Sequence, residues 1–489
     1  MQQNKGGEQK QLKLFGRFSI VLLFCASFVH AQNFADFKKS QEKSFAAYAD
    51  ERDNGFRNYL QEQFQEYQAH IAKPLYEEAK PKIILPAEPT EVLPQGPKIF
   101  IELPSQPEDN TTQTEPLALD TSKELVFDFY GTRLAFYVDA TIKKANFSPK
   151  TQAGIGNFFN TLALGSYQSL LGEIQATQEK MQLNDWGLTL LVTKMSTTLF
   201  QDEDNSKLFA WFVLNKLGYD VKVGLSKSHV VLMHYSQKDI YDTPNFTFSN
   251  KKYYVVSEYS KAVTHSVYSY DKSYPKADKA LDLSLRTLPS LHVQTKSKTL
   301  RFQHNAKEIK IAFNYNQNLI DFMASYPQAD YETYFNAPLE EQTYLAIAKE
   351  LKKEIDAKEA SLGINFVLNF VQNAFAYERD AEQFGREKVM FAQETLYYEK
   401  SDCEDRSVLF AALVHKLFKV PTIGIKYKDH MATGLFIPMF GDSVHVGNKR
   451  FVIADPTYIN AKVGQSMPKY KPLRPESFIV LKSDAPKGV

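Results

Sequence analysis

The stretch SDCEDRS at residues 401–407 contains Cys403, one of only two cysteines among the 489 residues of the chain. The apolar residues of the next segment, VLFAALVHKL, recur at helical spacing, which predicts a helix that begins beside this cysteine. Asp402 is a favourable N-cap, and the two acidic residues after Cys403 suit the first turn of a helix. Cys403 is therefore either a nucleophile at a helix start or a small buried residue among charges.

Three predicted strands follow this helix, and polar residues lie at the ends of two of them. The segment VPTIGIKY at residues 420–427 is β-branched and apolar, as is typical of a buried strand. His430 then opens a second strand, MATGLFIP, and a third strand, KRFVIADPT, ends at Asp455. Cys403, His430 and Asp455 are thus 27 and 25 residues apart, at the ends of a helix and two successive strands. This order can bring all three side chains to one edge of a sheet that packs against one helix.

A thiol, an imidazole and a carboxylate in one place can carry out acyl transfer through a thioester. The imidazole takes the thiol proton, the carboxylate fixes the imidazole tautomer, and backbone N–H groups at the helix start can hold the oxyanion. The helix dipole lowers a thiol pKa from about 8.5, but neighbouring carboxylates oppose this effect, so a cationic partner is needed. The candidate catalytic residues are Cys403, His430 and Asp455.

Each candidate also has a structural interpretation. A cysteine is often simply a buried apolar residue, and Asp455 can be a turn residue in the segment DPTY. Two histidines compete with His430: His415 lies inside the predicted helix, and His445 lies in GDSVHVGN, a loop or edge before the last strand. The three residue types at the ends of consecutive elements together favour catalysis.

The segment ETLYYEKSDCEDRSVLFAALV, with HMATGLF and FVIADPT, resembles the transglutaminase-like superfamily, and within it the bacterial transglutaminase-like cysteine proteinases. The resemblance covers residues 300–482, and VLNFVQNAFAYERD is similar to the lead-in segment of bacterial members. It implies an α+β fold with a papain-type triad, in which Cys403 is the nucleophile, His430 the general base and Asp455 the residue that orients the imidazole.

The surroundings of Cys403 depart from the family pattern in two respects. Ser401 stands at the position before the Asp-Cys pair where many relatives keep a small residue, and no Trp lies near Cys403 in the sequence. Any side chain that helps the oxyanion must then come from elsewhere. The candidates, for which packing is the alternative role, are Tyr397, Tyr398 and Gln372.

The region before this domain contains an apparent internal repeat. EDNSKLFAWFVLNKLGYDVKVG at residues 203–224 aligns with EDRSVLFAALVHKLFKVPTIG at residues 404–424, with one inserted residue. Upstream, LVFDFYGTRLAFYVD and LRFQHNAKEIKIAFNYN both have a strand, turn, strand pattern, and downstream NKKYYVVS matches NKRFVIAD. Three matches in the same order predict a duplication, the alternative being an unrelated α+β domain with a similar amphipathic helix.

The first copy lacks the thiol, because a carboxylate stands in its place and cannot form a thioester. Residues 122–290 are therefore predicted to be a degenerate transglutaminase-like domain that serves packing, substrate binding or docking. The aligned pairs are Asp202 with Cys403, His229 with His430, and Ser257, beside Glu258, with Asp455.

Metal binding is the other possibility for the first copy. Asp202, Glu203 and Asp204 could ligate an ion, but such clusters are usually solvated helix caps. No metal and no cofactor is predicted for this chain.

Residues 1–31 have the pattern of an export signal. Basic residues precede the apolar run FSIVLLFCASF, and VHA ends at Ala31, where cleavage is predicted. The apolar run is shorter than the roughly 18 to 20 residues of a membrane-spanning helix. Cys25 raises a lipoprotein alternative, which Phe24 disfavours. Cys403 would be the only cysteine after cleavage, and an odd thiol in an exported protein is either intermolecular or reactive.

Two segments separate the signal from the globular part. Residues 32–80 carry aromatic side chains mostly three, four, seven or eight positions apart, which predicts an amphipathic helical arm that binds a partner or packs on its own protein. Residues 81–121 contain eight prolines and few apolar clusters, which predicts a linker that is partly extended.

The predicted fold is α+β, with the degenerate domain at residues 122–290 and a catalytic transglutaminase-like (papain-like cysteine protease) domain at 297–482. Cleavage at Ala31 leaves 54 basic against 56 acidic residues, a net charge of −2, which gives no electrostatic case for nucleic-acid binding. The predicted function is that of an exported cysteine hydrolase of the periplasm or cell surface. It would act on a protein or peptide substrate of the envelope and have no membrane span after signal cleavage. The alternatives are a transglutaminase-type acyl transferase and a non-catalytic envelope scaffold.

Overall fold

The computed structural model describes residues 50–103, 123–256 and 265–482. The chain divides into a unit that ends at Tyr59 and a unit that begins at Leu60. Residues 50–59 of the first unit are helical, and the helical backbone continues to Glu62. The predicted signal peptide, including Cys25, lies outside the described residues.

The helical arm predicted over residues 32–80 is wrong beyond Glu62. Two short strands follow instead, β1 (Gln65–Gln68) and β2 (His70–Ile71). They are the two outermost strands of a seven-stranded sheet. The ring centroids of Tyr67, in β1, and Phe248 lie 4.3 Å apart. Pairing with the sheet edges thus overrides the helical spacing of the aromatic residues, because strand formation depends on neighbouring strands more than on local sequence.

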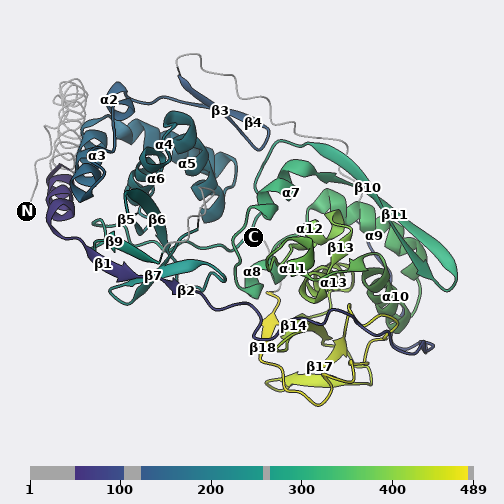
Figure 1. The fold of residues 1–489 in the computed structure, drawn as a ribbon. Coiled ribbons are helices and arrows are strands. Elements are labelled where there is room, and N and C mark those ends of the chain that lie inside the picture. Colours follow the sequence, from purple (N-terminus) through teal and green to yellow (C-terminus); the bar gives the residue numbers. More distant parts are fainter. Residues whose placement is uncertain (1–49, 104–122, 257–264, 483–489) are drawn as a thin grey trace, which may run out of the picture. The chain divides into compact units, whose positions relative to one another are not determined.

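The first α+β module contains this sheet, with strand order β1-β9-β5-β6-β8-β7-β2, and a separate β3–β4 hairpin. Helix α6 packs on the sheet, where it contacts both β5 and β6, and the helices α3 and α5 pack on α6 (Figure 1). The strands are β3 (Leu125–Phe129), β4 (Thr132–Phe136), β5 (Val221–Ser226), β6 (His229–Tyr235), β7 (Pro244–Phe248), β8 (Lys251–Tyr254) and β9 (Ser266–Ser269). The helices are α2 (Ala140–Lys143), α3 (Gln152–Leu164), α4 (Tyr167–Lys180), α5 (Asp185–Leu199) and α6 (Glu203–Lys216).

A long hairpin and a set of helices lead into the second module. The hairpin pairs all ten residues of each strand, and α9 packs against its second strand. The elements are β10 (Thr295–His304), β11 (Lys307–Asn316), α7 (Gln317–Ala324), α8 (Tyr331–Phe335), α9 (Glu341–Ile355), α10 (Ala360–Asn373), β12 (Ala376–Tyr377), α11 (Asp380–Gln383), α12 (Ala392–Tyr397) and β13 (Lys400–Ser401).

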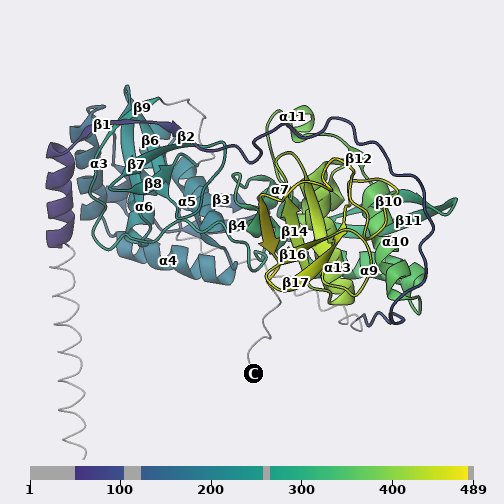
Figure 2. The same cartoon turned by 90° about the horizontal axis from the view of Figure 1, so that it is seen from below.

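The second module is built on helix α13 and a five-stranded sheet with the order β16-β17-β15-β14-β18. Helix α13 contacts β14 and β15, the two strands that follow it in sequence (Figure 2). The fold is therefore a mixed α+β fold, as predicted from the sequence. The elements are α13 (Cys403–Phe418), β14 (Thr422–Lys426), β15 (Met431–Leu435), β16 (Ser443–Val446), β17 (Lys449–Ala454) and β18 (Ser477–Val480).

The two sheets share an order of strands. Starting from the strand after the central helix, the first sheet runs β5-β6-β8-β7 with β9 on the other side of β5, and the second runs β14-β15-β17-β16 with β18 on the other side of β14. The register agrees as well: His234 pairs with Tyr254 in the first sheet, and Leu435 pairs with Val452 in the second. These four residues are the pairs that the sequence alignment sets opposite each other. Duplication of one module stays a prediction.

The proline-rich segment was predicted to be a linker over residues 81–121, and its described part is extended but docked. We call residues 72–102 the strap. Within this range the described backbone forms no helix and no strand. Backbone hydrogen bonds nevertheless join Ala87 to Ile459 and Ile99 to Lys358, so the strap lies along the second module (Figure 1). Residues 104–122 lie outside the described residues.

Across the described ranges, none of the helices is both long and apolar enough to cross a bilayer.

Candidate active site

His430 and Asp455 meet at one edge of the second sheet. His430 directly precedes β15 and Asp455 directly follows β17, and these two strands are antiparallel neighbours. His430 Nε2 lies 2.8 Å from Asp455 Oδ2, and both side chains are buried. The predicted contact between these two residues is therefore present in the structure.

Asp455 is itself held in place by the turn after β17. Its Oδ1 accepts hydrogen bonds from the backbone N–H groups of Thr457 at 3.0 Å and Tyr458 at 3.2 Å. The two carboxylate oxygens thus have different tasks, one in the turn and one on the imidazole. Asp455 therefore both stabilises the turn in the segment DPTY and contacts His430, so the two roles considered for it from the sequence are combined.

The orientation of His430 leaves one ring nitrogen available. The ring stacks on Tyr470 with centroids 4.6 Å apart. Nδ1 has no hydrogen-bond partner among the described residues. A carboxylate on Nε2 favours the tautomer that carries its proton there, so Nδ1 can accept a proton from a nucleophile.

Cys403 is the first residue of α13 and is fully buried. One turn further along, Ser407 Oγ donates a hydrogen bond of 3.2 Å to the backbone oxygen of Met431, the residue after His430. The helix start is therefore tied to the start of β15. The structure brings the beginning of α13, the beginning of β15 and the end of β17 into one region, as the sequence predicted.

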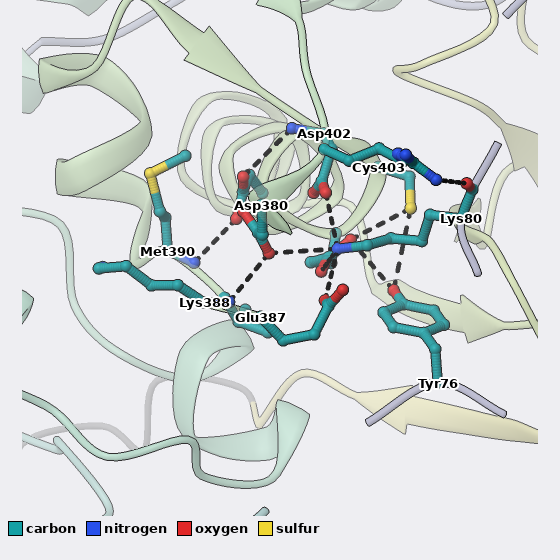
Figure 3. Close-up of polar contacts among 12 residues, drawn as sticks. Tyr76, Lys80, Asp380, Glu387, Lys388, Met390, Asp402 and Cys403 are labelled. Atoms are coloured by element: carbon teal, nitrogen blue, oxygen red, sulfur yellow. Dashed lines mark hydrogen bonds and ion pairs between the residues drawn. The ribbon is translucent and has the colours of Figure 1, made fainter. Parts of the chain in front are cut away.

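The thiol of Cys403 does not contact His430 in this structure. Cys403 Sγ donates to Glu404 Oε2 at 3.1 Å, and the hydroxyl oxygen of Tyr76 lies 3.8 Å from the sulfur (Figure 3). Burial raises the pKa of the Cys403 thiol, and the carboxylates of Glu404 and Asp402 raise it further. Cys403 is thus a protonated thiol here, which agrees with the expectation that neighbouring carboxylates oppose a thiolate.

A cation does lie beside the helix start, Lys80 from the strap, but its effect on the pKa of Cys403 is outweighed by burial and the carboxylates. Its ammonium group lies among four carboxylates (Figure 3). The distances from Lys80 Nζ are 2.6 Å to Glu404 Oε1, 2.6 Å to Asp402 Oδ2, 3.1 Å to Asp380 Oδ2 and 2.8 Å to Glu387 Oε2. We call these four acids and Lys80 the carboxylate cluster.

Burial and the Lys80 ammonium have opposite effects on the pKa values of the acids in this cluster, and burial prevails at Asp402, whose pKa is raised well above its usual value. Burial alone would raise the pKa of Glu404, but the Lys80 ammonium lowers it to about 2. Burial alone would lower the pKa of Lys80, but the carboxylates of Asp402, Glu404 and Asp380 raise it, so the lysine stays charged. Burial raises the pKa of Asp380 to about 7. Oxygen atoms of Asp380, Glu387 and Glu404 lie close enough together to hold a metal ion, and the lysine supplies the positive charge there.

Two buried residues fix the first turn of α13. Asp405 accepts hydrogen bonds from the backbone N–H groups of Met390 at 2.8 Å and Asp402 at 3.2 Å. Arg406 donates to Ser401 Oγ at 3.1 Å and to two backbone oxygens, one at the end of α10 and one just after it, at 3.2 and 2.8 Å. Burial lowers the pKa of Arg406 to about 10, so the guanidinium remains charged near neutral pH. The motif DCEDRS therefore holds the helix start as well as the candidate nucleophile.

The side chains proposed to help an oxyanion make other contacts. Gln372 Nε2 donates to the backbone oxygens of Asp455, Tyr458 and Ala461 at 3.1, 2.8 and 3.1 Å, so it fixes the loop after β17. The rings of Tyr397 and Tyr398 pack on each other, 4.9 Å apart between centroids. All three residues have the packing role that was their alternative interpretation.

The first module has a different arrangement at the corresponding positions. Asp202 is the N-cap of α6 and accepts from the Asn205 backbone N–H at 2.9 Å. His229 is mostly exposed, and its Nδ1 lies 3.3 Å from Asp204 Oδ2 on the helix α6. Ser257 and Glu258 lie outside the described residues. The described residues of the first module thus place a helix cap where the second module has a thiol.

Sequence reasoning missed Tyr76 and Lys80. Both are buried against the start of α13 although they are more than 300 positions away in sequence. The requirement for a cation beside Cys403 was a usable signal, but neither spacing nor composition distinguishes Lys80 from the other lysines of a proline-rich segment.

Comparisons with known proteins give little further information. No family model matches the chain, and no curated protein matches it. Among solved structures, the chain is similar to the crystal structure of a candidate cysteine protease from Cytophaga hutchinsonii. The sequences are 18% identical, the TM-score is 0.19, and the match covers 26% of this chain and 41% of that chain. The candidate function is accordingly derived from the residues of the site.

Proposed function

We propose that residues 297–482 form a transglutaminase-like cysteine hydrolase that cleaves a peptide or amide bond of an envelope or secreted protein. The observation that carries this proposal is the buried His430–Asp455 pair, 2.8 Å apart, at the sheet edge beside the helix that begins at Cys403. Buried titratable pairs are costly and often belong to functional sites. His430 Nδ1 has no hydrogen-bond partner among the described residues, so it is available to take a proton from a nucleophile.

The first chemical step is attack by Cys403. His430 Nδ1 takes the proton of the thiol, and the sulfur forms a bond to the carbonyl carbon of the substrate. Asp455 holds the imidazole in the reactive tautomer and stabilises its positive form. Backbone N–H groups in the first turn of α13 donate to the oxyanion that develops, since they have no partner within the helix.

The second step releases the products. The tetrahedral intermediate expels the amine, which takes the proton from the imidazolium, and a thioester to Cys403 remains. Water then attacks the thioester while His430 accepts its proton, and the acid product leaves as the thiol is restored. An amine in place of water would give acyl transfer by the same residues.

The first module, with residues 122–290, is proposed to be a degenerate copy that binds or positions the substrate. The observations in its favour are the shared strand order and register of the two sheets. Its helix start carries a capping aspartate, which has no nucleophilic role in this setting. Export to the periplasm or cell surface is part of the same proposal and is supported by the pattern of residues 1–31.

The experiment compares the envelope and secreted proteins of cells that carry the wild-type chain or Cys403→Ala. We expect protein ends that depend on Cys403 and that disappear in the variant. His445→Ala is the matched control, since His445 lies on the edge strand β16 and is exposed. New cross-links in place of new ends would favour acyl transfer, and identical proteomes for wild type and Cys403→Ala would contradict catalysis.

A further inference from the structure

The strap covers the candidate nucleophile with two buried side chains. Tyr76 donates from its hydroxyl to Glu404 Oε2 at 3.1 Å and lies 3.8 Å from the sulfur of Cys403. Lys80 lies 5.0 Å from the centre of the Tyr76 ring, so the ammonium group and the ring pack on each other. Cys403 has no exposed surface in this arrangement. A substrate carbonyl cannot reach the sulfur while this part of the strap is in place.

The strap also holds the thiol in an unreactive state. The carboxylate of Glu404 accepts hydrogen bonds from Cys403, Tyr76 and Lys80 at once. The strap therefore fixes the group to which the thiol donates its hydrogen bond. The thiol consequently turns to Glu404 and leaves His430 Nδ1 without a partner among the described residues. Catalysis needs the opposite arrangement, in which the thiol gives its proton to His430.

The attachment of the strap is uneven along its length. From Gln95 to Ile101 it exchanges hydrogen bonds with α10 and the turn before it, including Ser361 N to Gln95 O at 3.1 Å and Ala357 N to Ile99 O at 2.8 Å. Near Lys80 the bonds between backbone groups are fewer, and Glu78 N reaches Lys428 O only at 3.4 Å. Side chains hold the backbone there instead: Tyr377 donates to Pro81 O at 2.6 Å and Arg379 to Lys80 O at 3.3 Å. The side chains of Glu77 and Glu78 are exposed. Residues 75–81 are thus held mainly through side chains, so a ligand that replaces the contacts of Tyr76 and Lys80 can release them while the later part of the strap stays attached.

Charge limits what can take the place of Lys80. Asp380, Asp402 and Glu404 are buried, and Lys80 is the cation within 3.1 Å of all three. Among these acids the Glu404 carboxylate depends most on the ammonium, because burial raises the pKa values of Asp402 and Asp380. Removal of the ammonium alone would leave the Glu404 carboxylate buried without its counter-charge, which is unfavourable. A ligand that displaces the strap is therefore favoured when it brings a positive charge of its own.

We propose that residues 75–81 are an autoinhibitory segment, and that the substrate which displaces them inserts a cationic group into the carboxylate cluster beside Cys403. This inference rests on the proposed function of the second module and adds its regulation and the charge of its substrate. The segment acts as a tethered competitor: Tyr76 covers the sulfur, and Lys80 fills the subsite for the cation.

The test measures how fast the thiol of Cys403 reacts with methanethiosulfonate reagents in the full chain. The thiolate bonds to the reagent sulfur to form a mixed disulfide, and methanesulfinate leaves. Three reagents carry a cationic, a neutral or an anionic group. Mass spectrometry of the peptide that contains Cys403 gives the rate at this residue alone.

Wild type is compared with Tyr76→Ala, Lys80→Gln and the control Lys82→Gln, a lysine of the strap that is exposed. We expect slow reaction in wild type and Lys82→Gln. Loss of the Tyr76 hydroxyl and ring should increase the rate about tenfold or more, since one or two hydrogen bonds oppose opening. In Tyr76→Ala and in Lys80→Gln the cationic reagent should react faster than the anionic one. This preference should be larger in Lys80→Gln.

Lys80→Gln buries uncompensated carboxylates and can fail to fold, so Tyr76→Ala and the milder Tyr76→Phe decide the result in that case. Equal rates in wild type and Tyr76→Ala would overturn the autoinhibitory role, and so would absence of reaction in every folded variant. Equal rates for cationic and anionic reagents would overturn the cationic subsite. The reaction of the thiol with these reagents does not require catalytic turnover. The autoinhibitory proposal can therefore be contradicted while Cys403-dependent protein ends are still found. Conversely, the expected rates can be observed while no such ends appear, which would contradict only the proposed function.

Discussion

The two modules place the same elements around a helix and differ at its first turn. In the first module Asp202 caps α6 and Asp204 contacts the exposed His229. In the second, Cys403 begins α13 and a buried histidine faces Asp455 from the neighbouring strand. One strand order thus accommodates either a solvent-facing helix cap or a buried set of reactive groups, so the fold alone does not give the function.

The difference extends to charge. The helix start of the second module carries Asp402, Glu404 and Asp405, all fully buried, and Lys80 from the strap lies 2.6 Å from both Asp402 and Glu404. The corresponding Glu203 of the first module is exposed and pairs with Lys207 on its own helix at 2.6 Å. A surface ion pair of that kind contributes little to stability. Of the two helix starts, the one in the module with the thiol therefore buries more acidic side chains.

The largest effect is expected from the two aligned positions at the helix start. Cys403→Ala should reduce cleavage of the envelope substrate by about 10⁴-fold or more, because the covalent step is lost. Asp202→Ala should leave cleavage unchanged and cost only the stability of a helix cap, about 1 kcal/mol. The rate at which substrate-derived protein ends appear gives the first value, and urea unfolding gives the second. Loss of cleavage in folded Asp202→Ala would remove the contrast between the modules.

A somewhat smaller effect is expected from the two carboxylates that contact histidines. Asp455→Asn should keep the fold but reduce cleavage about 10³-fold, because an amide does not hold the reactive tautomer of His430. Asp204→Asn, at the His229 contact of the first module, should not change the rate. The measurement is the same assay of protein ends, and a rate for Asp455→Asn within a factor of a few of wild type would contradict the role given to Asp455.

Arg406 and its aligned residue Asn205 test how each helix start is held. Arg406→Met removes three hydrogen bonds to buried acceptors and should lower the free energy of unfolding by about 4 kcal/mol. Asn205→Ala removes one accepted bond from the Phe147 N–H, at 2.8 Å, and should cost about 1 kcal/mol. Urea denaturation of the full chain measures both values, and equal costs would show that the first turns are held alike.

The smallest effect concerns acid stability and His234, the buried residue of β6 that corresponds to Leu435. Burial lowers the pKa of His234 from 6.5 to about 4. A base whose pKa is lower in the folded state adds stability above its unfolded pKa, and this stability is lost as the pH falls from about 6.5 towards 4. Between pH 6.5 and 5 the loss should be about 2 kcal/mol.

His234→Leu places the residue of the second module in the first and should remove this part of the acid sensitivity. Thermal unfolding of both chains at a series of pH values makes the comparison. Parallel curves for wild type and His234→Leu over this range would contradict the assignment.

The sequence sufficed for the helix at Cys403, the strands after it and the meeting of His430 with Asp455. These features depend on local periodicity and on the rule that adjacent antiparallel strands bring their opposite ends together. Tyr76, Lys80 and the strands β1 and β2 could not be predicted in this way. Their positions depend on contacts with residues far away in sequence, and extended or proline-rich segments carry no periodic signal for such contacts.

The predicted linker shows the same limit. Prolines in the strap correctly indicate an extended backbone, but they do not show whether it is solvated or docked. The bond from Ala87 to Ile459 joins backbone groups, which every sequence supplies. Ser361 docks the strap through its backbone N–H and its hydroxyl, and a lone serine gives no signal of such a role. From the sequence, the carboxylates in DCEDRS were expected only to disfavour a thiolate at Cys403. In the structure, two of them also form part of the site that Lys80 occupies.

The most direct test of catalysis by Cys403 uses two purified full-length chains, Tyr76→Ala and Tyr76→Ala with Cys403→Ala, because both have the strap loosened. Each is incubated with envelope proteins from cells that lack the protein, and new protein ends are identified by mass spectrometry. We expect a discrete set of new ends with the chain that keeps Cys403 and none with the other. The same ends with both chains, or none with either while Cys403 reacts freely with methanethiosulfonates, would contradict a hydrolase built on Cys403, His430 and Asp455.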